Sequence, residues 1–417
     1  RIKKRAVKFL ETLAKSPKAS IPQACQGWAE TQAAYRFYSN ESVTWDKLLK
    51  AHTDQVEQRI IRSEEPVILC LQDTTELDFN GQETEDLGRL SYDAQRGMYL
   101  HPTLCITPER IPLGVSDAWM WSRGKTKKED RECPLIKESD RWIEGYERVA
   151  EMADREGDIL NLMARAKALN MPADWLVRAK HNRKLSKDER LWDRLDKQEV
   201  MSRISFIKPR KKGEKSRQIQ QELKVLRCTF PVRGKEGIAV TLVQTKEVNP
   251  PKGKSPLIWR LLSNRTVENE EQACELIDWY RCRWEIEMFF DVLKVGCKVE
   301  KLQLSSKERI EKALIMAMIV AWRVMYLMRL GRTCPDLPAE LIFDSLEWKS
   351  SYVLLEKTIP KKTPTLNTVL RNLATLGGFL GRKSDGDPGA KSIWIGFQRI
   401  QDCVFGIQMA RKLEGLD

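Results

Sequence analysis

The segment EPVILCLQDTTELDFNG spans residues 65–81 and sets the class of fold that the sequence predicts. Its first part, Val67–Leu71, is a continuous apolar run, which is typical of a β-strand buried on both faces. Asp73 follows this run directly, and the dipeptide Asn80-Gly81 marks a turn. A buried strand of this kind, next to helical segments, favours a mixed α/β fold.

Further β-rich and helical segments surround this strand. Residues 97–123 contain two more β-rich segments joined by the turn TPER, so we expect three strands within 66–121, the last two antiparallel. The interval 138–152 has helical character and leaves no room for a strand before the acidic turn DREGD. Helical periodicity covers four other stretches, namely 1–60, 269–293 (unbroken), 305–330 and most of 345–417.

Length and composition exclude several classes of protein. The 417 residues correspond to two or three domains at roughly 100–200 residues each. With 41% hydrophobic and 31% charged residues, the chain is neither disordered nor fibrous. Its longest apolar run, Ala313–Trp322, is ten residues, whereas a membrane span needs about 20. We therefore expect a globular protein without a membrane partner.

Positive charge is concentrated in one part of the chain. The net charge is +13, and residues 178–236 contain 19 Lys and Arg against 8 Asp and Glu. Within this interval, the run KPRKKGEKSR (208–217) is expected to be a hairpin loop or a mobile segment. Such an excess favours a polyanionic partner, although a solvated basic surface is the alternative. If the partner is a nucleic acid, we expect Lys208, Arg210, Lys211 and Lys212 to contact its phosphates without reading its bases.

Cysteine and histidine usage gives no sign of a zinc site or of secretion. The ten cysteines form no C-x-x-C pair, and there are three histidines. Reduced cysteines and the basic, amphipathic start without a cleavage site favour a cytoplasmic, nucleoid-associated protein. Because the sequence begins with Arg1, we expect residues upstream of it.

One helical segment, DWYRCRWEIEMFFDVLK (278–294), carries a polar stripe. At 100° per residue, Tyr280, Arg283, Glu287 and Lys294 project from one face. Taken alone, this stripe is better explained by an ordinary amphipathic helix with an Arg283–Glu287 pair.

Two other carboxylates favour a functional role for this polar stripe. Asp73 follows the buried strand, where a carboxylate is costly unless it binds a metal or a cation. Asp154 opens the turn DREGD. Each acid alone is commonly a cap or turn residue. Together with Glu287, they form the set that a two-metal phosphoryl-transfer site requires, because Mg²⁺ prefers carboxylate oxygens.

The spacing of Tyr280, Arg283, Glu287 and Lys294 resembles the signature of the insertion-sequence-four family of bacterial DDE transposases, the relatives of the transposon-five transposase. Two more motifs agree with this resemblance, QDTTELDF (72–79) with the first-Asp strand and DREGDI (154–159) with the second-Asp motif. The resemblance continues nearly end to end, through AAYRFYSN, NPPKGKSPLIWRLLSN and LATLGGFLGRKSDGDPGAKSIWIGFQRI.

The resemblance implies roles for individual residues. Asp73, Asp154 and Glu287 would bind two Mg²⁺ ions, for which Mn²⁺ would substitute. Tyr280, Arg283 and Lys294 would hold phosphates. Trp259 would stack on a flipped base, Trp284 would lie near that strand, and Arg178 would steady a DNA hairpin.

The resemblance also implies a fold and an activity. The expected fold is a ribonuclease-H-like mixed sheet (61–344) with a basic β-rich insertion at about 165–265. A helical DNA-binding region (1–60) and a helical dimerisation region (345–417) would flank it. The expected activity is cut-and-paste transposition of double-stranded DNA through a hairpin intermediate, by a homodimer on paired ends. For that dimer, we expect an apolar patch on the last helix, comprising Trp394, Phe397, Ile400, Val404, Phe405 and Ile407; the alternative is that these residues pack on the helix at 313–330.

Two departures from the family leave a second hypothesis open. Relatives have residues before the position of Arg1 and an apolar strand before the second Asp. The chain could therefore be a truncated, DNA-binding inhibitor of a full-length transposase. Its three intact acids favour the enzyme.

Overall fold

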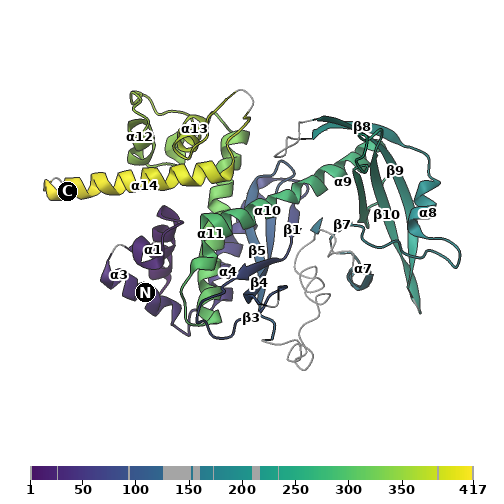
Figure 1. The fold of residues 1–417 in the computed structure, drawn as a ribbon, viewed down its shortest axis with the longest axis horizontal. Coiled ribbons are helices and arrows are strands. Elements are labelled where there is room, and N and C mark those ends of the chain that lie inside the picture. Colours follow the sequence, from purple (N-terminus) through teal and green to yellow (C-terminus); the bar gives the residue numbers. More distant parts are fainter. Residues whose placement is uncertain are drawn as a thin grey trace. The chain divides into compact units, whose positions relative to one another are not determined.

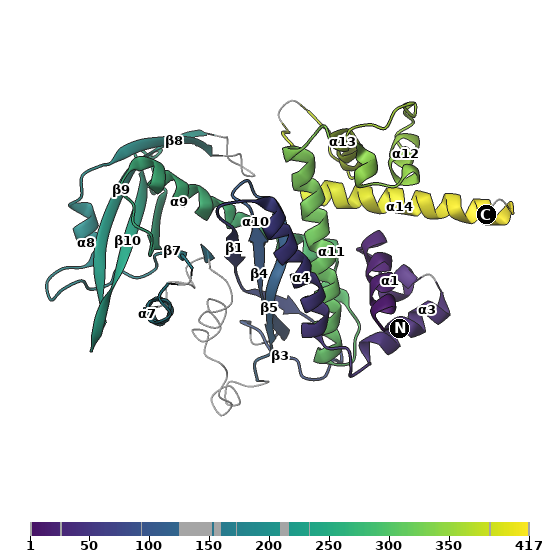
Figure 2. The same ribbon diagram turned by 180° about the vertical axis from the view of Figure 1, so that it is seen from behind.

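The computed structural model describes most of the chain, which folds as two compact units (Figures 1 and 2). The described residues are 2–25, 27–92, 94–124, 152–153, 160–171, 173–208, 217–232, 234–382 and 385–415. Unit 1 comprises residues 1–68, 74–133 and 285–417, and unit 2 comprises residues 69–73 and 134–284. Each unit has its own helices and strands.

Unit 1 begins with the helices that the periodicity predicts. They are α1 (Ile2–Lys15), α2 (Ile21–Cys25), α3 (Trp28–Tyr38) and α4 (Trp45–Ser63). Phe9 of α1 contacts Phe37 and Tyr38 of α3 edge-on, with ring centroids 6.1 and 5.3 Å apart. The buried Lys312 donates hydrogen bonds of 3.1 Å to the carbonyl oxygens of Tyr38 and Asn40. These contacts fix the first helices to the rest of unit 1.

The strands of unit 1 form an antiparallel sheet. They are β2 (Thr75–Asp78), β3 (Gly88–Arg89), β4 (Arg96–Ile106) and β5 (Pro112–Trp121). All pairings among them are made with β4, and the predicted antiparallel pair is β4–β5. Helix α4 lies close against β5 at Gly114, where a Cβ atom would come within 2.4 Å of Val56. Gly114 also has a φ of +143°, so glycine is required there for both reasons.

Helix α11 (Lys307–Thr333) runs along unit 1 and confirms the long helix predicted at 305–330 (Figure 1). By its length and its mean hydropathy of 1.7 over 18 residues, this helix could cross a membrane. Its longest uninterrupted apolar run is the ten residues Ala313–Trp322. However, 61% of that window is buried within the protein. Burial of this extent is usual for a core helix, whose apolar side chains face other protein elements.

The C-terminal region is helical, as predicted. It consists of α12 (Ser345–Val353), α13 (Leu366–Leu376) and α14 (Ala390–Leu413), preceded by a short 3₁₀ turn at Ala339–Leu341. The apolar patch expected on α14 is mostly covered, since Trp394, Phe397, Ile400 and Val404 are at most 9% exposed. Most of the expected patch therefore packs within unit 1, mainly against α11 and α13, whereas Phe405 is 37% exposed and Ile407 is partly exposed, so the patch stays accessible only at these two residues.

Unit 2 contains a sheet that changes from parallel to antiparallel. In spatial order its strands are β1 (Leu69–Gln72), β6 (Met152–Ala153), β7 (Leu176–Arg178), β11 (Ile258–Ser263), β10 (Lys235–Glu247), β9 (Arg217–Val232) and β8 (Ser202–Lys208). The first three are parallel and the rest antiparallel. The two-residue β6 corrects the expectation that no strand precedes Asp154. The pairing of β8 with β9 reaches Lys208 and Arg217, as expected for strands on either side of a hairpin.

The helices of unit 2 cover this sheet. Helices α7 (Leu160–Ala168) and α8 (Leu191–Asp196) pack on the antiparallel strands around the buried Trp175 and Phe230. The segment predicted as one unbroken helix at 269–293 is interrupted. It comprises α9 (Glu270–Cys282) in unit 2, followed by α10 (Trp284–Asp291) and a π-helical turn, η2 (Val292–Gly296), which belong to unit 1 from Glu285 onward. A wheel with 100° per residue therefore does not hold from Tyr280 to Lys294.

One buried histidine in unit 1 makes the stability of that unit depend on pH. His52 of α4 accepts a hydrogen bond of 3.2 Å from the Val115 N–H, and its ring contacts Trp322 edge-on. Burial, followed by the charge of Arg59, lowers the pKa of His52 to about 3. A neutral imidazole is required, because a protonated ring cannot accept that hydrogen bond.

We expect acid to destabilise unit 1 through His52. An unfolded histidine has a pKa of about 6.5, so below this pH the unfolded chain binds a proton that the folded chain excludes. The stability contributed above pH 6.5 is lost as pH falls towards 3, by roughly 2 kcal/mol at pH 5. Urea unfolding at pH 7 and pH 5 measures this loss of stability. In His52→Gln, which keeps a hydrogen-bond acceptor but cannot be protonated, the loss should be smaller by roughly 2 kcal/mol. The same pH dependence in both proteins would disprove the assignment.

Candidate active site

The structure brings Asp73 and Arg283 together, although they are 210 residues apart in the sequence. Asp73 follows β1, whose four residues are all buried. Its Oδ2 lies 3.3 Å from Nη1 of Arg283, and the two side chains are 22% and 11% exposed. A carboxylate at the end of a buried strand requires a metal or a cation beside it, and Arg283 supplies the cation.

Arg283 also connects Asp73 to Tyr280. The guanidinium carbon lies 6.0 Å from the centroid of the Tyr280 ring. Arg283 interrupts the helical hydrogen bonding between α9 and α10, although its φ of −52° and ψ of −30° remain helical. Both side chains are largely buried. The first two residues of the signature therefore lie beside the first Asp.

An aromatic cluster continues from Tyr280. Trp259 of β11 is partly exposed and lies 6.3 Å from Tyr280 and 6.2 Å from Phe206 of β8, the latter in a stacked geometry. The guanidinium of Arg281 lies over both Phe206 and Trp259, at 5.1 and 5.6 Å. Phe206 and Arg281 were not predicted from the sequence. The sequence signal for Phe206 was the alternation of polar and apolar residues in RISFIK, and the signal for Arg281 was its position directly after Tyr280.

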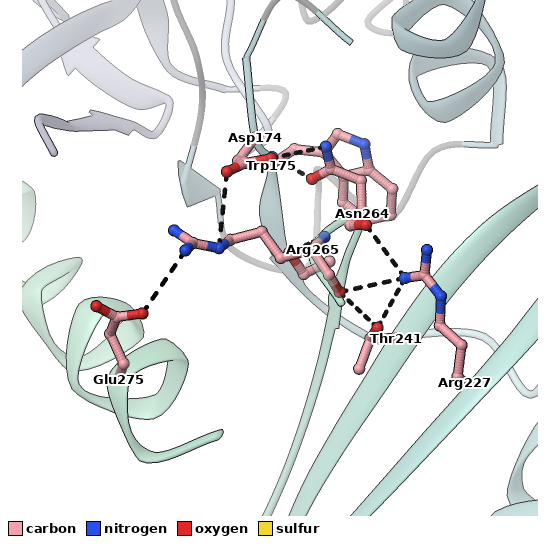
Figure 3. A network of polar contacts seen from close by, with 8 residues as sticks. Asp174, Trp175, Arg227, Thr241, Asn264, Arg265 and Glu275 are labelled. Carbon is pink, nitrogen blue, oxygen red and sulfur yellow. Dashed lines mark hydrogen bonds and ion pairs between the residues drawn. The ribbon is translucent and has the colours of Figure 1, made fainter. Parts of the chain in front are cut away.

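A polar network fixes the start of α9 to the sheet of unit 2 (Figure 3). Arg265 lies 3.7 Å from Asp174 and 3.8 Å from Glu275 of α9. Its carbonyl oxygen accepts hydrogen bonds from Arg227 and Thr241, at 3.2 and 2.5 Å. Asn264 extends the network, accepting from the Trp175 N–H (2.8 Å) and donating to Asp174 (3.0 Å). Since Tyr280 belongs to α9, this network helps to hold the aromatic cluster in place.

A second basic site lies around Arg178 on β7. A pocket in unit 2 is lined by Arg178, Ala179, Lys180, Trp192, Ile258 and Arg260. The guanidinium of Arg260 lies 4.3 Å from the Trp192 ring centroid and donates to Gln244 at 2.7 Å. Arg178 is the one lining cation that the sequence analysis predicted to bind DNA. Lys180 and Arg260 line the same pocket and are two further cations beside Arg178.

The remaining signature residues belong to unit 1. Glu287 is partly exposed on α10, while Trp284 in unit 2 is 58% exposed. Lys294 lies in the π-helical turn η2, with its Nζ 3.9 Å from Glu300. Ile286 and Phe289 of α10 are buried, whereas Glu287 on the same helix is partly exposed.

A buried ion pair that was not predicted from the sequence orients α10. Glu285 is 1% exposed and forms a bidentate pair with Arg329 of α11, whose Nε lies 3.0 Å from Oε2. Arg110 approaches the same carboxylate at 4.0 Å. Burial raises the pKa of Glu285, and the charges of Arg329 and Arg110 oppose this shift. Two residues along a helix are 200° apart, so burying Glu285 turns Glu287 outward.

Some predicted residues lie outside the described part of the chain. They are Asp154, Arg210, Lys211 and Lys212, and of Lys208 only the backbone is described. Within the described ranges, no group of three or more His, Cys, Asp or Glu side chains could hold a metal ion. Asp73 and Glu287 belong to different units.

Comparison with known families identifies the class of protein. The Transposase DDE domain model matches residues 114–323, which is half of the chain. The chain therefore belongs to the DDE transposase family. The Transposase DNA-binding model matches residues 1–43, and the Transposase Tn5 dimerisation domain model matches 319–415. With these flanking domains, the chain is a Tn5-like member of the class.

A solved structure shows a distant similarity. The piggyBac transposase synaptic complex with hairpin DNA matches with a TM-score of 0.36 and 11% identity. The match covers 64% of this chain and 49% of that one, so the chain spans about half the length of this relative. A similarity of this size supports no argument about the site.

Proposed function

We propose that this protein is a cut-and-paste DNA transposase that cleaves transposon ends through a hairpin and joins their 3′-OH groups to target DNA. The observation that carries the proposal is the contact of Asp73 with Arg283, and of Arg283 with Tyr280, in a chain of the DDE class. The proposed core is ribonuclease-H-like. The protein would act in the cytoplasm on the nucleoid, as a homodimer holding two ends.

Asp73, Asp154 and Glu287 would hold two Mg²⁺ ions, or Mn²⁺ in their place. The donor chemistry fits, because Asp73 offers partly exposed carboxylate oxygens at the end of a buried strand. When bound, such ions stabilise the attacking and leaving oxygens of an in-line displacement at phosphorus. Arg283, which pairs with Asp73, would also compensate the carboxylate charge and lie close to a scissile phosphate.

The reaction would consist of four displacements at phosphorus. Water cuts one strand and leaves a 3′-OH, which attacks the opposite strand, forms the hairpin and releases the flanking DNA. Water then reopens the hairpin, and the freed 3′-OH attacks target DNA. In each step, one P–O bond forms as another breaks, so one site can serve all four.

DNA would be held by cations and aromatic rings of several segments of the chain. Tyr280, Arg283 and Lys294 would bind phosphates, with Trp284 beside the same strand. Arg178, with Lys180 and Arg260 in its pocket, would bind the hairpin. The four basic residues predicted at 208–212 would contact the backbone without reading sequence.

Cleavage of a matched end duplex tests this function. In Mg²⁺, a denaturing gel should show the nicked strand first, then the hairpin, and finally the reopened end. EDTA should stop all three products. Strong cleavage would exclude a pure inhibitor, whereas binding without cleavage in Mg²⁺ and Mn²⁺ would overturn the enzyme assignment.

Trp259 is expected to act in hairpin formation only. A hairpin joins two strands across a duplex, so a base near the break must leave the stack at a cost of a few kcal/mol. Stacking on an aromatic face returns roughly 1–3 kcal/mol. Trp259→Ala should therefore slow hairpin formation about 5- to 150-fold and leave the first nick unchanged, as measured by quenched time courses. A loss of the same size in both steps would mean that Trp259 only supports the cluster with Phe206.

A further inference from the structure

A short 3₁₀ turn, η3 (Val299–Lys301), places a carboxylate beside Lys294, the last residue of the signature. Nζ of Lys294 lies 3.9 Å from Oε1 of Glu300. The two side chains are 28% and 30% exposed, so the pair is open to solvent on one side. Both residues belong to unit 1. The ion pair therefore connects two successive turns within one unit.

The backbone between Lys294 and Glu300 is fixed by its own conformation and packing. Lys298 has a left-handed conformation, with φ of +50° and ψ of +40°, and reverses the chain before η3. Leu293 and Val299, the neighbours of the paired residues, are at most 1% exposed and anchor the two turns in the core. With the backbone held in this way, the geometry of the pair depends on the side-chain rotamers.

Glu300 is itself attached to the segment that begins at the end of β2. Its Oε1 accepts a hydrogen bond of 3.1 Å from the Asp78 N–H, and its carbonyl oxygen accepts one of 2.9 Å from Nε2 of Gln82. Gln95 in turn donates to Oδ2 of Asp78 at 2.8 Å. These tertiary contacts set the position of the carboxylate, and the longer side chain of Lys294 adapts to it.

Backbone hydrogen bonds hold the same two segments together without Glu300. The Glu85 N–H donates to the carbonyl oxygen of Ser305 at 3.0 Å. The Lys307 N–H donates to the carbonyl oxygen of Glu85 at 3.2 Å. Because these bonds do not involve the side chain of Glu300, a substitution there should leave the segments joined.

We propose that Glu300 is a positioning residue, which holds the ammonium group of Lys294 in the orientation that meets a DNA phosphate. The inference rests on the proposed function, in which Lys294 binds a phosphate of the transposon end. A lysine side chain has a flexible four-carbon stem and loses rotamer freedom when its end is fixed. The pair with Glu300 restricts these rotamers before the DNA binds, so less freedom is lost when the cleavage complex forms.

Loss of the Glu300 charge should affect DNA binding and DNA cleavage differently. A carboxylate near the DNA repels phosphates, so its removal favours binding, whereas the disorder of Lys294 opposes binding. These two effects act in opposite directions on the affinity. The cleavage rate depends on where the ammonium group lies in the transition state, and a small displacement there is costly. A residue that served only the fold would lower binding and cleavage together.

The variant Glu300→Gln tests the proposal, because its amide oxygen can still accept from the Asp78 N–H but carries no charge. Fluorescence anisotropy with a labelled end duplex in EDTA should give an affinity within about twofold of the wild type. Single-turnover cleavage in Mg²⁺ at saturating DNA should be about three- to tenfold slower. The control Glu83→Gln removes the same charge from an exposed position of the neighbouring segment and should change neither quantity by more than about twofold. An equal loss of cleavage in both variants would overturn the proposal.

A double-mutant cycle shows whether Glu300 acts through Lys294. Lys294→Met removes the ammonium group and should slow cleavage. Adding Glu300→Gln should then cause a further loss of no more than about twofold, because no ammonium group remains to be positioned. Losses that multiply, or wild-type cleavage by Lys294→Met, would overturn the proposal. Failure of the proposed function would look different, because the wild type itself would then cleave no end duplex.

Discussion

Replacing Glu287 with alanine is expected to reduce cleavage of an end duplex by about 10³-fold or more while leaving DNA binding intact. Removing one carboxylate from a two-metal site removes several kcal/mol of charge stabilisation from the transition state, and each 1.4 kcal/mol is a factor of ten in rate. Glu287 is partly exposed on α10 and is not part of the core, so its loss should not unfold unit 1. Single-turnover cleavage in Mg²⁺, with binding measured in EDTA, would separate the two effects.

Asp291→Asn provides a matched control. Asp291 is exposed, lies one turn further along α10 and carries the same charge, so a general electrostatic effect on DNA would appear in both variants. We expect Asp291→Asn to cleave within about twofold of the wild type, since a surface charge away from the reacting groups contributes little. Wild-type activity in Glu287→Ala would rule out the assigned role.

The sequence predicted the elements that local patterns determine. The apolar run before Asp73 became β1, the turn TPER joined β4 and β5, and the period of 305–330 became α11. Each depends on contacts or torsions within a few residues. The contact of Asp73 with Arg283 was foreseen only as a requirement for some cation, because the identity of that cation depends on tertiary folding.

Other features could not be read from local patterns. The wheel through Tyr280 and Lys294 assumed 100° per residue, but Arg283 interrupts the helix and η2 has π-helical geometry. The apolar stripe on α14 was predicted to be a dimer surface, with packing in the core as the alternative, and contacts with residues distant in sequence bury most of it. A signal for Glu285 did exist, since the alternation in WEIE places its two acids on opposite sides of one helix.

Breaking the buried pair of Glu285 with Arg329 is expected to destabilise unit 1 by about 3–5 kcal/mol. In Glu285→Ala, the guanidinium of Arg329, which is 12% exposed, would keep its charge without the bidentate carboxylate. Guanidinium cannot lose its proton to avoid this cost. Chemical denaturation followed by circular dichroism would measure the difference. The comparison variant is Glu311→Gln, which removes another buried acid whose partner Lys307 is 27% exposed and can rehydrate.

Replacing both Glu285 and Arg329 separates two contributions to stability. One is the cost of leaving Arg329 buried without its carboxylate, and the other is the net contribution of the intact ion pair. Because burial raises the pKa of Glu285 despite Arg329 and Arg110, the ionised pair adds little net stability, and Glu285→Leu/Arg329→Met should recover most of the loss. The double variant would nevertheless lack the bidentate contact that fixes the rotation of α10. We therefore expect it to fold like the wild type but to require more Mg²⁺ for half-maximal cleavage, because Glu287 would be held less firmly. A double variant that is as unstable as Glu285→Ala would show that the pair itself stabilises the fold, and an unchanged Mg²⁺ requirement would show that Glu285 does not position Glu287.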